Sequence, residues 1–270
     1  MPLLKYTTVT AGSAEPGQWL FVLHGIYGAG RNWSSVIRDV INSRPDWGAR
    51  LIDLREHGAS RGFAPPHTMQ AAADDLERLA DDMGHPTAVI GHSFGGKVAL
   101  LWGSRAPAQL RQIWMVDSAP GSGRRAGSAW EMLGALERLP GPFASRDVGV
   151  AALEEAGIAE GTARWMVTNL EPEGDRFRWR LDTDVMRALL EDFYRTDLWA
   201  LVEAPPAGVE IHILRALGAS TIPDAMAQRL RSIGEHARVE LHEIEGGHWL
   251  NADNPNAVSA LLAELLPTDG

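Results

Sequence analysis

The sequence predicts an α/β protein with a mostly parallel sheet, helices on both faces of the sheet and an inserted helical segment. Short apolar runs that predict strands alternate with helical patterns, which is typical of such sheets. A glycine-rich turn, Gly-His-Ser-Phe-Gly-Gly at positions 91–96, lies between one of these runs and a helical pattern. Between residues 126 and 202 only helical patterns occur. Together these three observations predict the fold class.

The strands are predicted by short apolar runs, because a strand buried on both faces has no polar side. The run Trp-Leu-Phe-Val-Leu at 19–23 is the clearest. The run at 6–9 carries polar residues and predicts an edge strand. In chain order, the expected strands lie at residues 6–9, 19–23, 49–52, 87–90, 110–116, 209–214 and 239–244.

The covering helices are predicted by the spacing of apolar residues. In the segment 68–82, Met69, Ala72, Leu76 and Leu79 recur three or four residues apart, which places them on one helix face. The other helices around the sheet are expected at about 33–41, from 97 onward, at 223–233 and at 254–266.

After Pro120 the sequence predicts an inserted helical lid. Gly-Ser-Gly-Arg-Arg at 121–125 has the composition of a linker, and the stretch that follows is rich in tryptophan and methionine. Most of these side chains are expected in the core, and some are expected to shape an apolar acyl pocket. We therefore assign residues 1–120 and 204–270 to a core domain and residues 121–203 to a lid.

Composition and charge exclude several classes of protein. The chain of 270 residues is 45% hydrophobic and 22% charged, as expected of a soluble protein with one large core. Its formal net charge of −10 argues against nucleic acid or an anionic membrane as a partner. The absence of cysteine excludes disulfides, zinc–thiolate sites and a cysteine nucleophile. With no apolar signal core and no long apolar run, we expect a cytoplasmic monomer or small homo-oligomer without a membrane span.

The turn at 91–96 is the pattern of a nucleophile elbow, Gly-x-Ser-x-Gly between a strand and a helix. Its glycines allow a tight turn that exposes the hydroxyl of Ser93 at the carboxyl end of the sheet. A plain turn or a helix cap is the simpler alternative. Gly91 to Lys97 also fits a phosphate-binding loop, but that loop needs Ser or Thr after the lysine, and Val98 stands there.

The glycine-rich loop at 24–30 is the candidate for one side of an oxyanion hole. In hydrolases with an elbow, this loop and the residue after the nucleophile supply two N–H donors. Here these donors are Ile26, with Tyr27 as the alternative, and Phe94. A dinucleotide-binding loop is excluded by spacing, because the glycines follow Gly-x-x-Gly-x-Gly rather than Gly-x-Gly-x-x-Gly.

His248 is the expected general base. A serine hydroxyl needs a base to take its proton, and in elbow hydrolases the base follows the last strand, in the order serine, acid, histidine. His248 follows the run at 239–244 and two glycines. Of the other histidines, we expect His212 and His242 to be structural, His24 and His92 to bond backbone groups, and His57, His67, His85 and His236 to lie in loops or on the surface.

The acid that orients the histidine is less clear from the sequence. The loop after the penultimate strand, residues 215–221, contains no carboxylate. Asp117, at the end of the strand that follows the elbow helix, lies on the same sheet edge and is favoured. Asp224 is the alternative, although its place at a helix start is explained by the helix dipole. Asp184 in the lid is a third candidate.

With these residues in place, the chain resembles α/β-hydrolase fold serine esterases, most closely the abhydrolase-domain-11 and YbfF-type subfamily. The resemblance implies hydrolysis of carboxylic esters or thioesters without metal or cofactor, and the family's strand-six aspartate matches Asp117. Glu56, where an asparagine is usual, and residues 118–120 depart from the pattern and bear on specificity. The matching segments lie at residues 24–28, 32–33, 53–60, 91–97, 116–120, 168–170, 177–180 and 246–249.

The sequence therefore predicts a serine hydrolase that acts on small or acyl-chain esters, or on acyl-thioesters. Ser93 is the expected nucleophile, His248 the base and Asp117 the orienting acid. The alternatives are a carbon–carbon bond hydrolase or lyase with the same triad, and a ligand-binding receptor on a hydrolase scaffold. The residues expected to contact substrate are His24, Gly25, Tyr27, Trp165 and Trp249.

Overall fold

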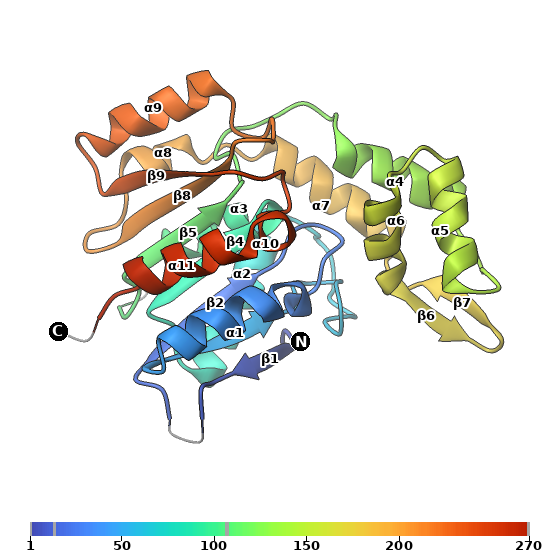
Figure 1. The fold of residues 1–270 in the computed structure, drawn as a ribbon, viewed down its shortest axis with the longest axis horizontal. Helices are drawn as coiled ribbons and strands as arrows, with labels where there is room; N and C mark the ends of the chain where they lie inside the picture. The colour runs from blue at the N-terminus through green and yellow to red at the C-terminus, as the bar shows by residue number, and fades with distance from the viewer. Residues whose placement is uncertain (1, 13–14, 106–107, 269–270) are drawn as a thin grey trace.

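The computed structural model describes residues 2–12, 15–105 and 108–268, and its centre is a seven-stranded sheet (Figure 1). The strand order is β1-β3-β2-β4-β5-β8-β9, and neighbours are parallel except for β1 against β3. Every apolar run that predicted a strand forms one. The strands are β1 (Tyr6–Val9), β2 (Gln18–Leu23), β3 (Trp47–Ile52), β4 (Ala88–His92), β5 (Gln112–Val116), β8 (Glu210–Ala216) and β9 (Val239–Ile244).

Helices cover both faces of this sheet, which explains why its central strands are apolar on both sides. Helices α1 (Ser34–Ser43) and α11 (Pro255–Leu265) pack together on one face. Helices α2 (Met69–Met83), α3 (Phe94–Gly103) and α9 (Asp224–Gly234) contribute to the core on the other. No helix in the described ranges is both long and apolar enough to cross a membrane. The predicted α/β architecture is confirmed.

The parallel strands bring the loops at their carboxyl ends to one edge of the sheet. In the register of the central strands, Leu23 is opposite Gly91 and Gly91 is opposite Met115. Val116 is in turn opposite Leu214 of β8. The loops after β2, β4, β5, β8 and β9 therefore meet at this edge, which is where α/β sheets place their ligands.

Most of the chain between β5 and β8 forms an additional layer beside the sheet edge, whereas its last helix, Trp199–Glu203, lies beside α9 (Figure 1). We call residues 121–203 the inserted segment. The sequence predicted helices only, but the structure also contains an antiparallel hairpin, β6 (Leu170–Glu173) and β7 (Arg176–Trp179). The helices are α4 (Ser128–Arg138), α5 (Arg146–Glu155), α6 (Glu160–Met166), η2 (Val167–Asn169), α7 (Thr183–Arg195) and α8 (Trp199–Glu203).

Candidate active site

Ser93 lies in a strained turn between β4 and α3. Its backbone has φ 49° and ψ −112°, a region that non-glycine residues rarely adopt. The flanking glycines make the turn possible. A Cβ on Gly91 would lie 2.0 Å from the carbonyl oxygen of Gly95, and one on Gly95 would lie 2.5 Å from that of His24. The strained serine conformation and the packing of both glycines match an elbow that presents its hydroxyl.

The end of β5 fixes the backbone of Ser93 on both sides. The Ser93 N–H donates to the carbonyl of Val116 at 2.9 Å. The hydroxyl of Ser118 donates to the Ser93 carbonyl at 2.6 Å, a contact that no sequence pattern indicated. The Ser93 hydroxyl itself makes no hydrogen bond to a described residue. The backbone is therefore held while the side chain remains available.

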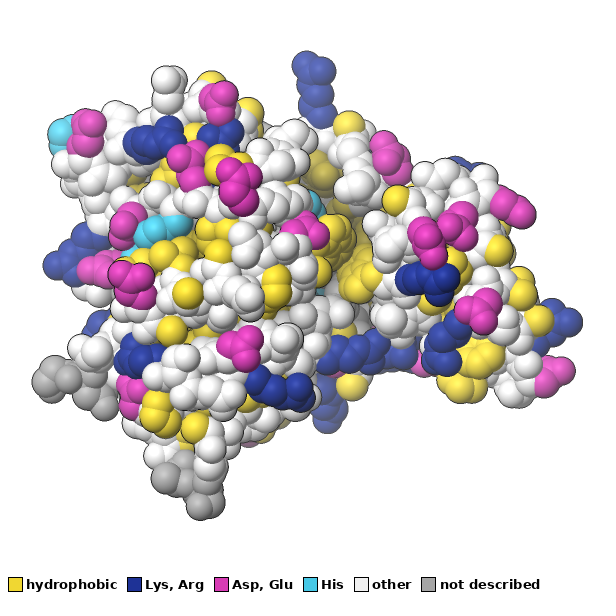
Figure 2. All heavy atoms as spheres, viewed as in Figure 1, with side chains coloured by type: hydrophobic (Ala, Val, Ile, Leu, Met, Phe, Trp, Pro, Cys, Tyr) yellow, Lys and Arg dark blue, Asp and Glu magenta, His cyan; other side chains and the backbone are white. Residues whose placement is uncertain are grey.

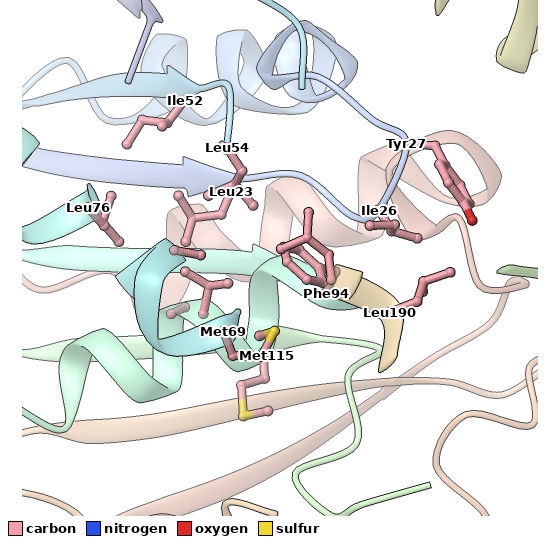
Figure 3. Close-up of a cluster of buried hydrophobic side chains, with 14 of the residues drawn as sticks. Leu23, Ile26, Tyr27, Ile52, Leu54, Met69, Leu76, Phe94, Met115 and Leu190 are labelled. Carbon is pink, nitrogen blue, oxygen red and sulfur yellow. The ribbon is translucent and has the colours of Figure 1, made fainter. Parts of the chain in front are cut away.

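The two backbone N–H groups that the sequence indicates as oxyanion donors, those of Ile26 and Phe94, have no hydrogen-bond partner in the part of the chain that the structure describes. Phe94 begins α3, so its N–H has no partner within the helix. The N–H of Ile26 likewise makes no hydrogen bond to a described residue. The loop of Ile26 comes close to the elbow because Gly25 lacks a side chain: a Cβ there would lie 2.9 Å from the His92 ring. Figure 3 shows Ile26 and Phe94 near one another, with Leu190 of α7 beside them.

Tyr27, the alternative oxyanion donor in the sequence analysis, is not available for that role. Its N–H donates to Nε2 of His57 at 3.1 Å. Its carbonyl accepts from the Asn169 amide at 2.8 Å, and its hydroxyl donates to the Ala129 carbonyl at 2.8 Å. Tyr27 has φ 63°, so these three bonds hold a left-handed residue in place. Two of the three partners belong to the inserted segment.

His57 was predicted to be a loop or surface residue; it lies in the loop between β3 and α2, but it is not on the surface. Its side chain is fully buried against the glycine-rich loop at residues 24–30. Nδ1 donates to the Arg55 carbonyl at 2.8 Å, which leaves Nε2 as the acceptor for Tyr27. Burial lowers the pKa of His57 to about 3, with a smaller contribution from the neighbouring His24, so the ring stays neutral. The burial of His57 was not evident because the loop has a charged sequence, which is typical of an exposed segment. The charge of Arg55 is in fact buried as well, where it pairs with buried Asp75.

His248 and Asp117 are in direct contact. Nδ1 of His248 lies 2.6 Å from Oδ2 of Asp117, which is fully buried. The other carboxylate oxygen accepts the N–H of Ala216 at 3.2 Å. Thr221, which the sequence analysis did not single out, places its hydroxyl 3.2 Å from the same His248 nitrogen. This arrangement fixes Nε2 of His248 as the nitrogen that is free to act as a base.

The other two candidate acids lie elsewhere. The side chain of Asp224 is 91% exposed and pairs with Arg215. Asp184 is exposed in the first turn of α7. Of the three carboxylates, the structure brings Asp117 alone to His248.

The main cavity, of about 870 Å³, opens between the sheet edge and the inserted segment. Ser93, His248, Ile26 and Phe94 all line it. Figure 2 shows hydrophobic side chains in this hollow. The apolar lining includes Met132 of α4, Trp165 of α6, Phe193 of α7, Met226 of α9 and Trp249.

Of the residues expected to contact substrate, Gly25, Tyr27, Trp165 and Trp249 line the cavity. Trp165 and Trp249 meet across it, with ring centroids 4.4 Å apart. His24 does not line it. Its ring is buried behind the loop, where Nδ1 donates to the Gly25 carbonyl and Nε2 accepts the Leu54 N–H. His24 therefore supports the loop rather than contacting a ligand.

Lys97 joins the elbow helix to the inserted segment. Its ammonium group donates to the carbonyls of Gly121, Phe193 and Thr196 at 2.7–2.8 Å. A phosphate-binding lysine needs a free ammonium group, whereas all three donors of this one are used. The geometry thus disfavours the phosphate-loop alternative on a second ground, besides Val98.

Comparisons with known proteins show which family and fold the chain is similar to. The sequence pattern of the alpha/beta hydrolase family matches residues 20–261. A mouse protein named sn-1-specific diacylglycerol lipase ABHD11 is 26% identical over 272 residues, covering 96% of this chain and 85% of the relative. Lipase LipV of Mycobacterium tuberculosis is 28% identical, covering 94% and 95%. A solved marine microorganism esterase superposes with a TM-score of 0.84 at 24% identity, covering 98% and 99%.

Proposed function

The chain belongs to the alpha/beta hydrolase family, and we propose that it is a serine hydrolase that cleaves carboxylic esters. The resemblance to abhydrolase-domain-11 proteins is confirmed by the similarity to their mouse member. Curated relatives of similar length carry the names lipase and diacylglycerol lipase, which supports a carboxylester substrate. We assign the reaction to Ser93, His248 and Asp117.

One observation carries this proposal: a buried carboxylate holds His248 in the cavity that Ser93 also lines. Asp117 accepts the Nδ1 proton at 2.6 Å, so Nε2 is left without a proton and can accept one. Free N–H groups of Ile26 and Phe94 line the same cavity. Nucleophile, base, orienting acid and oxyanion donors thus converge on one place, as acyl transfer requires.

In the proposed reaction, Nε2 of His248 takes the Ser93 proton as the oxygen attacks the ester carbonyl. The tetrahedral oxyanion receives hydrogen bonds from the N–H groups of Ile26 and Phe94, each worth on the order of 100- to 1,000-fold in rate. His248 then protonates the leaving alcohol, and an acyl-enzyme remains on Ser93. Water attacks this ester with His248 again as base, the bond between the acyl group and Ser93 breaks to release the carboxylic acid, and His248 returns the proton to the Ser93 oxygen. The hydrogen bond between Ser93 and His248, which this structure does not show, forms in the substrate complex, as it does in many enzymes whose free form lacks it.

We further propose that residues 121–203 act as a lid that supplies the acyl-binding wall. Met132, Trp165 and Phe193 come from this segment and line the cavity. All three side chains are apolar. The methionine is flexible and the two aromatic rings are flat, and both kinds of surface can pack against a hydrocarbon chain. An apolar wall of this kind favours acyl esters over charged substrates, and an acyl-thioester presents the same acyl group.

Hydrolysis of p-nitrophenyl acyl esters of increasing chain length tests the proposal. Ser93→Ala should abolish turnover, because no other hydroxyl is placed on the elbow. Ser220→Ala is the matched control, since Ser220 lines the same cavity and should retain activity. Turnover of Ser93→Ala at the wild-type rate would refute the assignment.

A further inference from the structure

Away from the cavity, three side chains with metal-binding atoms lie together on β8 and β9. They are His212, Glu240 and His242. His212 is paired with Glu240 in the parallel register, and His242 follows two residues later on β9. Because side chains alternate along a strand, all three project from the same face of the sheet. Figure 2 shows histidine side chains with carboxylates beside them over this part of the molecule.

The spacing of the three donor atoms matches the ligand shell of a small ion. Nδ1 of His212 lies 3.0 Å from Nε2 of His242 and 3.7 Å from Oε2 of Glu240. The last two atoms lie 3.8 Å apart. A circle through the three atoms has a radius of about 2.0 Å, which is close to the usual zinc–nitrogen and zinc–oxygen bond lengths. An ion near the centre of this triangle would therefore reach all three ligands without a backbone shift.

Neighbouring side chains fix the orientation of the His212 ring, which favours a bond from Nδ1 to a metal ion. The ring stacks on Trp114 of β5 with centroids 4.1 Å apart and planes 11° apart. Its second nitrogen, Nε2, is buried without a hydrogen-bond partner in the described residues. Oε2 of Glu210 lies 3.8 Å from that nitrogen. At this distance the carboxylate does not accept a hydrogen bond from the ring. It does lie on the side of the ring where metal-binding histidines usually have a carboxylate partner.

Nδ1 of His212 and Nε2 of His242 are within hydrogen-bond distance of each other, so one of the two carries a proton when no ion is bound. A neutral imidazole carries a single proton, which can sit on its other nitrogen instead. With the proton moved there, both facing nitrogens can donate a lone pair to an ion, and the Glu240 carboxylate supplies a negative charge.

We propose that His212, His242 and Glu240 form a binding site for a divalent transition-metal ion of the zinc class, separate from the reaction at Ser93. Two imidazoles and one carboxylate suit Zn²⁺ better than Mg²⁺ or Ca²⁺, which take oxygen ligands. The side chain of Glu240 is 62% exposed, so solvent can supply the fourth ligand. A bound ion ties the edge strand β9 to β8, and β9 leads directly to the loop of His248.

A second group on α2 and the turn after it, Glu77, Asp81 and His85, offers an internal comparison. It contains a single imidazole, and the Glu77 carboxylate already accepts the Trp102 indole N–H at 2.5 Å. We expect this group not to hold the ion. A variant of His85 therefore controls for removal of any histidine near a carboxylate.

The test is calorimetric titration of the tag-free, chelator-treated full chain with Zn²⁺, together with the visible absorption of the Co²⁺ form. We expect one ion per chain. The dissociation constant should rise about 100-fold in His242→Gln and about 10-fold in Glu240→Gln, since each removes a ligand. His85→Gln should bind as the wild type does.

The outcome can contradict the proposal in three ways. The wild-type chain could fail to bind Zn²⁺ stoichiometrically, Glu240→Gln could bind with unchanged affinity, or His85→Gln could lose the site. Glu240 is exposed, so the Glu240→Gln variant keeps the test decisive even if His242→Gln fails to fold. None of these readouts depends on esterase activity.

Discussion

At the residue scale, the contact between Asp117 and His248 sets the tautomer of the proposed base. Asn in place of Asp117 keeps the size and can still accept the Ala216 N–H, but its amide cannot accept the Nδ1 proton in the same way. By analogy with other serine hydrolases that carry this change, we expect kcat to fall about 10³- to 10⁴-fold. Ester hydrolysis by Asp117→Asn, with the fold checked by circular dichroism, measures this.

Asp224→Asn is the matched control for that variant. Asp224 is exposed and its partner Arg215 also pairs with Glu243, so the loss costs at most about 1 kcal/mol of stability. Activity should stay near that of the wild type. If Asp224→Asn rather than Asp117→Asn lost most of its activity, our choice of acid would be wrong.

Individual site residues differed in how far they could be predicted. Ser93 and His248 were indicated by local patterns, the elbow and the glycines after the last strand. The choice between Asp117 and Asp224 depended on which loop reaches His248. The distance from each carboxylate to His248 in the folded protein cannot be read from their spacing along the chain. The burial of His57 could not be predicted for a related reason, since it results from the packing of its loop against Tyr27.

At the scale of elements, the inserted segment and the oxyanion loop are joined through Tyr27. The buried amide of Asn169 donates to the Tyr27 carbonyl, one residue after the proposed donor Ile26. Asn169→Ala leaves this carbonyl without its partner and frees the loop to shift. A small displacement of an oxyanion donor lowers kcat by about 10- to 100-fold, with a smaller effect on KM. Steady-state kinetics on a p-nitrophenyl ester measure both constants.

The neighbouring Thr168→Ala provides the control, because Thr168 is exposed and bonds only within its own turn through its hydroxyl. It should leave kcat unchanged. A lowered melting temperature in Asn169→Ala with an unchanged kcat would show that the bond stabilises the fold without positioning the donor.

Elements of the core were predictable because apolar runs and helical spacing report burial directly. The β6–β7 hairpin was missed because its strands are short and largely exposed, so they carry no continuous apolar run. A signal was present in Pro-Glu-Gly-Asp at 172–175, which is rich in turn residues, and Gly174 adopts φ 63° there. Tertiary support from Phe143, whose backbone pairs with Phe177, could not be read from the sequence.

At the scale of the whole molecule, buried neutral histidines make stability depend on pH. Burial lowers the pKa of His24 to about 4 and those of His57 and His92 to about 3. In the unfolded chain these rings titrate near 6.5. Between these values the unfolded state binds more protons, so stability is full above about pH 6.5 and falls as the pH drops towards 4.

Urea unfolding at pH 7.0 and pH 5.5 measures this effect. We expect the free energy of unfolding to fall by about 1 kcal/mol for each of the three histidines. In His57→Gln this fall should be smaller by about 1 kcal/mol, because the variant lacks one of the three buried rings. His236→Gln removes an exposed ring and should show the same fall as the wild type. Equal stability of the wild type at both pH values would contradict the neutral, buried state of these rings.

The shape of the cavity is also a property of the whole molecule. Its walls come from the ends of several strands and from α4, α6 and α7, which are far apart in the sequence. The tryptophan- and methionine-rich composition predicted an apolar pocket, but the pairing of Trp165 with Trp249 depends on how the inserted segment seats on the sheet edge.

The central claim is that the Ser93 hydroxyl is activated by His248, and covalent labelling tests it most directly. A fluorophosphonate probe reacts with a serine whose proton is removed by a base, and peptide mass spectrometry locates the adduct. We predict one adduct, on Ser93, that disappears in both Ser93→Ala and His248→Ala and persists in Ser220→Ala. Labelling at another serine, or undiminished labelling in His248→Ala, would contradict the account.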